Sequence, residues 1–323
     1  MDLWDPFEIY ENEYNNHDYY DLNYCHSIYA DLKELLKDTT ITDKKSHMNP
    51  FHRIVWETWM PSFRKNILDI NLKDKEHCLK CVDIINQWHK LIPSWIIENI
   101  FEQIIMPKLI QQVEDWNPVV DTVPIHAWIH PWLPLIKERL EIALFPQIRF
   151  KLSNALTHWH PSDISAKAIL MPWKPPVFTS SSWDSFMLRN ILPKLESVLK
   201  EEFKINPSDQ NLEPWSWIME WRDLIPLASF ISLLEECFFP EWLKTLCEWL
   251  NSKPNYEEVT NWYSEWKKLL SEKISQHPNI KAKLGQGLMM MSRSSNGAKV
   301  SYNLEENKAK EIKTAVDSEA LKV

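Results

Sequence analysis

Cysteine and histidine residues occur at spacings that could hold a metal ion. Cys78 and Cys81 form a C-x-x-C pair directly after His77. A structural zinc site needs four ligands, and neither a second C-x-x-C nor an H-x₃₋₅-H pair follows at a suitable distance. Residues 74–88 also have a helical pattern of apolar positions. We therefore interpret the two cysteines as buried thiols of a helix and predict no metal site.

Histidine also raises the question of acid–base chemistry. His126 and His130 are four residues apart, but H-E-x-x-H is absent, and the surrounding Pro and Trp residues favour ring packing over metal binding. His160, Ser162 and Asp163 contain the residue types of a catalytic triad. Residues so close in sequence cannot form a nucleophile–base–orienter chain. We interpret Ser162 or Asp163 as the N-cap of the helix that follows.

The glycine distribution excludes several enzyme classes. All three glycines lie near the C-terminus, at Gly285, Gly287 and Gly297. A P-loop, a G-x-G-x-x-G loop and a G-x-S-x-G elbow all require glycine, so none can occur before residue 285. Nothing else in the sequence assembles a site. The sequence therefore predicts a non-enzymatic protein without a cofactor.

Apolar residues recur with a helical period through most of residues 47–275. The stripes at 92–109 and 227–250 are wide, which indicates helices buried on most sides in a multi-helix body. The first 284 residues, which contain no glycine, also lack the residue that hairpin turns use most. The predicted fold class is therefore all-α.

Proline punctuates these helices in a weak repeat. WHKLIP at 88–93, WIHPWLP at 128–134 and WRDLIP at 221–226 are each followed, 12–14 residues later, by a second proline. Proline is tolerated in the first turn of a helix and breaks its interior. We therefore predict a multi-helix array of helices of about three turns, opened and closed by proline, for which solenoid-like stacking is one arrangement. The proline-rich stretch 171–182 is the clearest internal linker.

The chain is expected to have three parts: an acidic, Tyr-rich N-terminal arm at 1–46, a helical domain at 47–284, and a flexible polar tail at 285–323. The net charge is −9, and residues 1–38 hold ten Asp or Glu against two Lys. The arm is either a solvated lead-in or an acidic–aromatic docking segment. Because the remaining body is nearly neutral, we do not expect direct nucleic-acid binding.

No apolar stretch reaches the roughly 18 residues that span a bilayer, so no membrane association is predicted. The N-terminal residues lack the basic and apolar regions of a signal peptide. We therefore expect an intracellular protein with reduced thiols.

Two stretches carry a family resemblance. They are WNPVVDTVPIHAWIHPWLP at 116–134 and LSNALTHWHPSDISAKAILMPWK at 152–174, supported by shorter stretches at 54–64, 238–243 and 254–267. Together they resemble the C-terminal region of the septin- and tuftelin-interacting protein family, a GC-rich-sequence DNA-binding-factor-like domain. The resemblance covers roughly residues 47–284, and ordered matches of Trp and Pro make it specific.

The resemblance implies a nuclear protein of the late spliceosome. Family members associate with proteins of the intron-lariat complex and help a DEAH-box RNA helicase to take that complex apart. Helicase activation in the family is attributed to a glycine-rich G-patch, which this sequence lacks. The chain would then be a C-terminal fragment or a short paralogue. Its expected role is a scaffold in splicing; alternatives are competition with the full-length factor, or a nucleic-acid-binding helical module. The family has no catalytic residues to carry over.

The candidate partner-binding residues lie in two irregular, Pro-rich and aromatic stretches. Such loops often present the side chains that dominate binding. The alternative is that the Trp side chains cement pairs of helices. The candidates are Trp116, Asn117, Pro118, Pro124, His126, Trp128, His130, Trp132, Trp159, His160 and Asp163.

Overall fold

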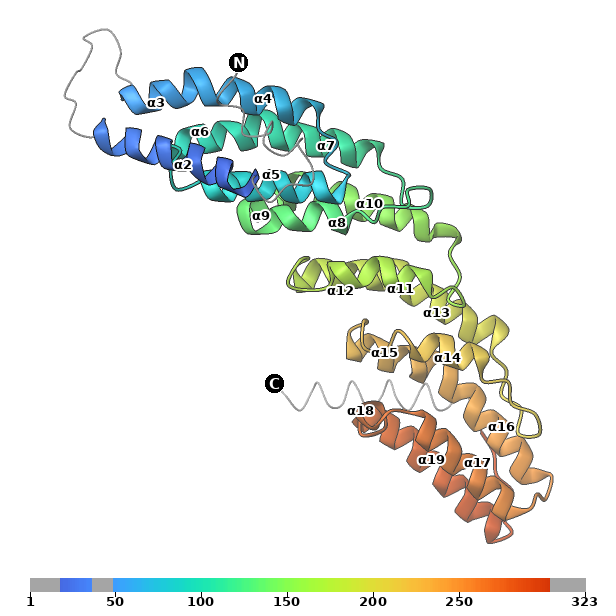
Figure 1. The fold of residues 1–323 in the computed structure, drawn as a ribbon. Helices are drawn as coiled ribbons and strands as arrows, with labels where there is room; N and C mark the ends of the chain where they lie inside the picture. Colours follow the sequence, from blue (N-terminus) through green and yellow to red (C-terminus); the bar gives the residue numbers. More distant parts are fainter. Residues whose placement is uncertain (1–17, 37–48, 303–323) are drawn as a thin grey trace, which may run out of the picture. The chain divides into compact units, whose positions relative to one another are not determined.

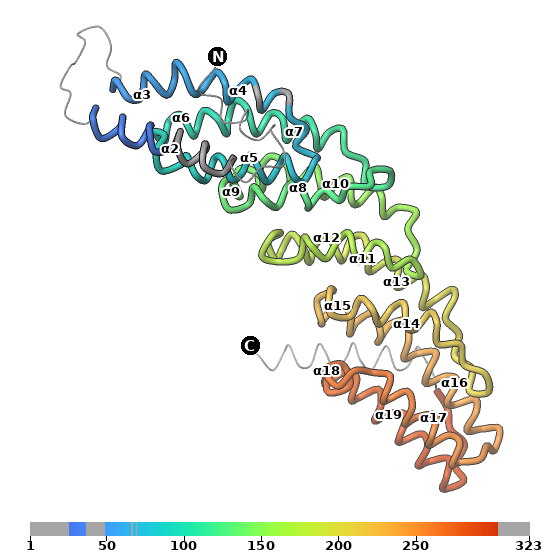
Figure 2. Tube along the Cα trace, viewed as in Figure 1, coloured from blue at the N-terminus to red at the C-terminus, as the bar shows by residue number. Residues whose placement is uncertain are grey.

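The computed structural model describes residues 18–36 and 49–302, and its path is drawn in Figures 1 and 2. The described residues form helices and loops without a strand, so the predicted all-α fold is confirmed. The chain divides into two compact units, residues 1–155 and 156–323.

The first unit consists of helices that include two short π-helical segments, η1 and η2, and one 3₁₀ segment, η3. In chain order they are α2 (Asp18–Leu35), α3 (Pro50–Ile54), η1 (Val55–Trp59), α4 (Met60–Asp69), α5 (Lys75–Trp88), α6 (Ser94–Ile100), η2 (Phe101–Ile105), α7 (Met106–Asp115), α8 (His126–Ile129), η3 (His130–Trp132), α9 (Leu133–Ala143) and α10 (Phe145–Ala155).

The second unit is also helical, with 3₁₀ segments η4 and η5 and π-helical segments η6 and η7. Its elements are η4 (Leu156–His158), α11 (Ser165–Leu170), η5 (Met171–Trp173), α12 (Ser180–Asn190), α13 (Leu192–Ser197), η6 (Val198–Glu202), α14 (Glu213–Met219), α15 (Leu227–Leu233), η7 (Leu234–Phe238), α16 (Phe239–Asn251), α17 (Tyr256–Leu269), α18 (Glu272–Ser275) and α19 (Pro278–Ser295).

Several consecutive segments join into long rods that contain proline near the middle. In α3–η1–α4, α6–η2–α7, α9–α10, α12–α13–η6 and α15–η7–α16, a large apolar residue and a proline begin the helix after a π-helical segment or a bend. The five pairs are Met60-Pro61, Met106-Pro107, Phe145-Pro146, Leu192-Pro193 and Phe239-Pro240. The prediction that the second proline of each repeat closes a helix is therefore wrong, since Pro107, Pro146 and Pro240 lie inside rods.

The π-helical segments explain how proline is tolerated there. Directly before three of the prolines, the backbone N–H donates to the carbonyl five residues earlier instead of four. These bonds join Met60 to Val55, Met106 to Phe101 and Phe239 to Leu234. A regular turn would bring the proline ring against the carbonyl four residues earlier, and the wider turn makes room for it. The rods therefore continue with a local irregularity instead of ending.

Rods that follow one another along the chain pack side by side within each unit. In the first unit α4 packs on η2, α7 packs on α10, and the shorter α5 packs on α8 and η3. In the second unit α13 packs on α15, η6 on η7, and α16 on α19. Inside each unit this is the nearest-neighbour stacking of a solenoid-like array.

Tryptophan fills the space between the stacked helices. In the first unit Trp59 stacks on Phe63 at 4.6 Å between ring centroids and lies 5.3 Å from Trp88. In the second unit Trp242 and Trp262 stack at 5.3 Å with only 7° between their planes. Each buried indole removes a large apolar area from water, so these rings dominate the core of each unit.

The structure shifts the predicted ends of the helical body. Part of the predicted arm is helix α2, in which Tyr29 is buried and its ring lies 5.2 Å from that of Trp88. At the other end α19 crosses the predicted boundary at 284, because its Gly287 face packs on α16. The predicted tail is described as far as residue 302, with Val300 buried and bonded to Asn251, whereas its remainder and the rest of the predicted arm lie outside the described residues. The acidic docking segment stays a prediction.

The predicted internal linker at 171–182 is instead a packed segment. It holds η5 and the start of α12, and Trp173 and Phe178 are buried and stacked at 5.1 Å. The two units meet in sequence earlier, between Ala155 and Leu156. Proline content alone therefore marked a turn between packed helices and not a boundary between units.

Candidate functional site

Four of the predicted partner-binding side chains are buried. Trp128 and Trp132 have no exposed surface, Trp116 is 3 % exposed and Trp159 is 9 % exposed. These indoles pack within their own units, so the expectation that they face a partner at the surface is wrong, and the alternative that they cement helices holds. An indole carries too much apolar area to stay in water when a neighbouring helix can cover it.

The helix that carries Trp128 also explains the C-x-x-C pair. Cys78 Sγ donates to the Trp128 carbonyl at 3.2 Å, which ties α5 to α8. Burial raises the pKa of both Cys78 and Cys81 to about 12, so the two thiols stay protonated. Within residues 18–36 and 49–302, no group of three or more His, Cys, Asp or Glu side chains could hold a metal ion.

His126 and His130 are half-buried neighbours on α8 and η3, with ring centroids 5.6 Å apart. Burial lowers the pKa of both imidazoles, and the adjacent His126 adds to the effect on His130, whose pKa falls to about 4. Both rings are therefore neutral near pH 7. Pro124, predicted with them, is exposed in the loop before α8.

His160 and Asp163 hold a loop of the second unit in place. Both ring nitrogens of His160 lie within hydrogen-bonding distance of a partner: Nδ1 is 2.8 Å from Ser162 Oγ, and Nε2 is 2.8 Å from Glu202 Oε1. Asp163 accepts two hydrogen bonds from Ser165, the first residue of α11: one from the Ser165 amide at 2.9 Å and one from the Ser165 hydroxyl at 2.8 Å. The predicted capping role of Asp163 is close to this, although Ile164 is the N-cap residue itself. Sequence reasoning missed Glu202, which only the fold brings near.

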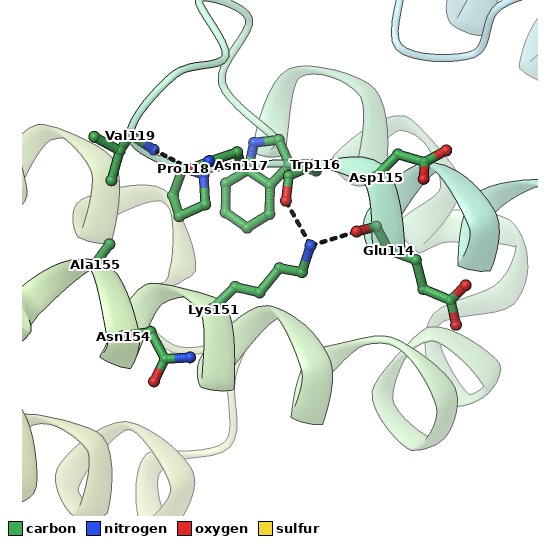
Figure 3. A pocket seen from close by; sticks show the side chains of 9 residues that line it. All are labelled: Glu114, Asp115, Trp116, Asn117, Pro118, Val119, Lys151, Asn154 and Ala155. Atoms are coloured by element: carbon green, nitrogen blue, oxygen red, sulfur yellow. Dashed lines mark hydrogen bonds between the residues drawn. The ribbon is translucent and has the colours of Figure 1, made fainter.

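The predicted residues Trp116, Asn117 and Pro118 line a surface pocket of about 460 Å³ in the first unit (Figure 3). The pocket lies between the loop that follows α7 and the last turns of α10. The other lining residues are Glu114, Asp115, Val119, Lys151, Asn154 and Ala155. Because this pocket gathers predicted partner-binding residues, it is the candidate functional site.

Lys151 fixes one side of the pocket. Its Nζ donates hydrogen bonds of 2.6 Å to the carbonyls of Glu114 and Trp116, at the C-terminal end of α7 (Figure 3). These carbonyls have no partner inside the helix, so the ammonium group serves as a C-cap. In the sequence, Lys151 follows Arg149 and Phe150, and nothing in that local pattern indicates a capping role.

The loop of the pocket is held in one conformation by its own polar groups. Asn117 Oδ1 accepts from the Val119 amide at 3.0 Å, and the Asn117 amide donates to Asp121 Oδ2 at 3.1 Å. Asp121 also lies 3.7 Å from Lys73 Nζ. The same loop leaves Val119 and Val120 exposed at 75 % and 71 %. The loop therefore presents apolar side chains from a fixed backbone.

The pocket has two chemically different ends. Pro118, Val119 and Ala155 lie together at one end, whereas the side chains of Glu114 and Asp115 extend from the α7 end (Figure 3). Apolar surface at one end and carboxylates at the other can recognise a ligand that combines the two complementary features.

Across the described helices, none is long and apolar enough to cross a membrane.

The stacked rods define the class to which the chain belongs: within each unit, it is an all-α protein of solenoid-like helix pairs. The chain belongs to the GC-rich sequence DNA-binding factor-like protein family, whose family model matches residues 20–246. The family resemblance seen in the sequence is thereby confirmed.

Individual relatives share extensive identity with the chain. Tuftelin-interacting protein 11 of Xenopus tropicalis is 47% identical over 277 residues, which is 85% of this chain and 33% of the relative. The proteins of the same name from Gallus gallus and Homo sapiens are each 44% identical over 294 residues, which is 90% of this chain and 33% of each relative. The chain thus spans about a third of the length of these curated relatives.

Proposed function

We propose that this protein is a non-enzymatic scaffold in pre-mRNA splicing, which binds proteins of the late, intron-lariat spliceosome in the nucleus. The observation that carries the proposal is the family match over residues 20–246, because the family resemblance points to that assembly. The candidate site supports a binding role: a fixed loop exposes Val119 and Val120 beside a pocket. The proposed partners include a DEAH-box RNA helicase of spliceosome disassembly.

The first test is a pull-down of the tagged full chain from nuclear extract, with and without RNase, read by mass spectrometry. We expect intron-lariat spliceosome proteins in both samples, because the proposed contacts are between proteins. Their loss after RNase would mean that RNA bridges the contact, and their absence from both samples would overturn the proposal. The same data report whether the helicase is retained.

A second experiment links the binding to the candidate site. The double variant V119S/V120S removes two exposed apolar side chains and should reduce the recovered partners several-fold without changing the thermal melt. The matched control is Leu212→Ser, which changes another exposed apolar side chain, in the second unit. Equal recovery with wild type and both variants would show that partners bind elsewhere on the chain.

A further inference from the structure

The acidic end of the pocket has an electrostatic arrangement that a stable helix does not favour by itself. Glu114 and Asp115 are the last residues of α7, and both are exposed. The C-terminal end of a helix carries a partial negative charge, so carboxylates are favoured at the opposite end. Among the residues that the structure describes, neither carboxylate forms an ion pair.

A second pocket of the same unit shows the contrasting arrangement. In that pocket, of about 380 Å³, Arg139 pairs with Glu98 and lies 3.9 Å from Glu102, and its guanidinium also lies 5.8 Å from the centre of the Phe101 ring. The chain supplies the counter-charge there. For Glu114 and Asp115, the residues that the structure describes supply no ion-pair partner, so these carboxylates can pair with a cation from outside the chain.

The single positive charge of Lys151 offsets only one of the two carboxylates in the pocket lining. Its ammonium group donates two hydrogen bonds to the backbone carbonyls of Glu114 and Trp116. These carbonyls carry the partial negative charge of the helix end. The Lys151 stem lies along α10 inside the pocket (Figure 3). An alkyl stem in that position contributes apolar surface. The local balance of the pocket therefore remains negative.

The apolar end suits a small aliphatic side chain. It is formed by Pro118, Val119 and Ala155, none of which brings a charge. The bonds from Asn117 to Val119 and Asp121 fix the loop before any ligand arrives. A preformed loop loses little conformational entropy on binding, so even a short segment could gain useful affinity.

We propose that this pocket binds a short segment of a partner protein in which a basic side chain lies next to a small aliphatic one. The basic group pairs with the carboxylates of Glu114 and Asp115, and the aliphatic group packs between Val119 and Ala155. This inference rests on the proposed scaffold function, for which it specifies the chemistry of the partner. The same carboxylates repel phosphate groups, which disfavours RNA as the occupant.

The test uses the purified full chain and four pools of fluorescent peptides. Each pool carries a fixed central pair, Arg-Leu, Arg-Ser, Glu-Leu or Glu-Ser, between randomised flanking residues, and binding is read by fluorescence anisotropy. We expect the Arg-Leu pool to bind about tenfold more tightly than the Glu-Leu pool, and this preference to weaken as salt is raised. Arg-Ser should be intermediate, because it lacks the aliphatic contact.

Two double variants locate the preference. Glu114→Gln with Asp115→Asn should reduce the preference for Arg-Leu over Glu-Leu to about twofold or less. Glu257→Gln with Glu258→Gln removes the same charge from an exposed pair at the start of α17 and should leave the preference intact. Thermal melts should show both variants folded: the melting temperature should stay the same or rise slightly for E114Q/D115N at the end of α7, and fall slightly for E257Q/E258Q in the first turn of α17.

Two outcomes would overturn the inference: equal binding of all four pools, or a preference for Arg-Leu that survives in the E114Q/D115N variant. Tighter binding of a single-stranded RNA of random sequence, measured in the same way, would assign the surface to nucleic acid instead. The peptide pools contain no spliceosomal protein, so their result is separate from the pull-down. A failed pull-down with a positive pool result would leave the pocket chemistry standing and remove only the splicing role.

Discussion

At the scale of single residues, Gly287 marks the closest approach between two helices of the second unit. A Cβ atom at this position would lie 2.9 Å from Cζ3 and 3.0 Å from Cη2 of Trp242, and 3.4 Å from Cδ2 of Leu246. The Trp242 ring is itself held against Trp262 in a stack. It has little room to move aside, so α19 can lie this close to α16 only with glycine.

We predict that Gly287→Ala destabilises the protein by about 1–3 kcal/mol, because the added methyl group overpacks the contact with Trp242. The matched control is Gly285→Ala, where no atom lies within 4 Å of the new Cβ. There alanine should stabilise the protein by about 0.4–1 kcal/mol, because it lowers the conformational entropy of the unfolded chain. Urea denaturation followed by circular dichroism measures both. Destabilisation of similar size in both variants would contradict the packing explanation.

A second residue-scale prediction concerns the acid stability of the first unit. The pKa of His130 falls from its ordinary value of 6.5 to about 4 in the folded protein, mainly because the imidazole is buried. Between pH 6.5 and about 4, His130 is therefore protonated in the unfolded chain but remains neutral in the folded chain. The free energy of unfolding should decrease as the pH falls from 6.5 to about 4.

His130→Gln removes this titration and should reduce the loss of stability across that pH range by about 1–2 kcal/mol, a figure lowered to allow for the partial exposure of the ring. His158→Gln, an exposed position in the second unit, is the control and should leave the loss as in wild type. Urea denaturation series at pH 7, 5.5 and 4 give the comparison. Parallel curves for all three proteins would show that His130 does not titrate as described.

At the scale of elements, half-buried lysines cap the carboxyl ends of successive rods. Lys108 Nζ donates to the carbonyls of Ile67 and Leu68 in the last turn of α4, and Lys151 Nζ donates to those of Glu114 and Trp116 at the end of α7. In both cases a residue of the next rod satisfies carbonyls at the end of the rod before it. In the second unit, Lys194 of α13 donates to the Thr157 carbonyl of η4 at 2.6 Å.

We predict that Lys151→Met costs about 1–2 kcal/mol of stability, because the methionine keeps the apolar stem but leaves the carbonyls of Glu114 and Trp116 without this donor. Lys75→Met, at an exposed position at the start of α5, is the control with a change near zero. Thermal melts compare the two. Equal melting temperatures would mean that water replaces the ammonium group at no cost.

The sequence predicted the elements better than it predicted their ends. The wide apolar stripes at 92–109 and 227–250 correspond to the rods that contain α6–η2–α7 and α15–η7–α16. Pro93 and Pro226 precede α6 and α15, as expected for prolines that open helices. The interior prolines misled the prediction because a π-helical turn accommodates the ring, and such a turn leaves no simple local pattern in the sequence.

The candidate site was predicted only in part, for a physical reason. The irregular, Pro-rich stretch after α7 identified Trp116, Asn117 and Pro118, which do line the pocket. The opposite wall, with Lys151 and Ala155, comes from α10, and only tertiary packing brings it near. Burial of Trp128 and Trp132 also depends on which helix covers them, which a hydrophobicity pattern cannot specify.

At the scale of the whole molecule, the two units should respond separately to local damage. Within each unit, rods pack mainly on the rods next to them in the chain. In such arrays stability is close to a sum of local terms, and unfolding need not be a single transition. A defect in one unit should therefore loosen that unit first.

We predict that Trp128→Ala and Gly287→Ala produce complementary patterns of hydrogen exchange in the full chain. Trp128→Ala removes a fully buried indole and should increase amide exchange within residues 49–155. Gly287→Ala should do so within residues 213–295, in the second unit. Mass spectrometry of the exchanged peptides measures both. Faster exchange throughout the chain in either variant would show that the molecule unfolds as one cooperative body.

The lysine caps also bear on how the surface reacts with acylating reagents. An amine attacks such a reagent through its lone pair, but the ammonium groups of Lys151 and Lys194 are already directed onto backbone carbonyls. Exposed amines such as that of Lys75 carry no such constraint. Chemical or enzymatic acetylation of the folded chain should therefore be slower at the lysines that donate to backbone carbonyls, because each must first give up those hydrogen bonds.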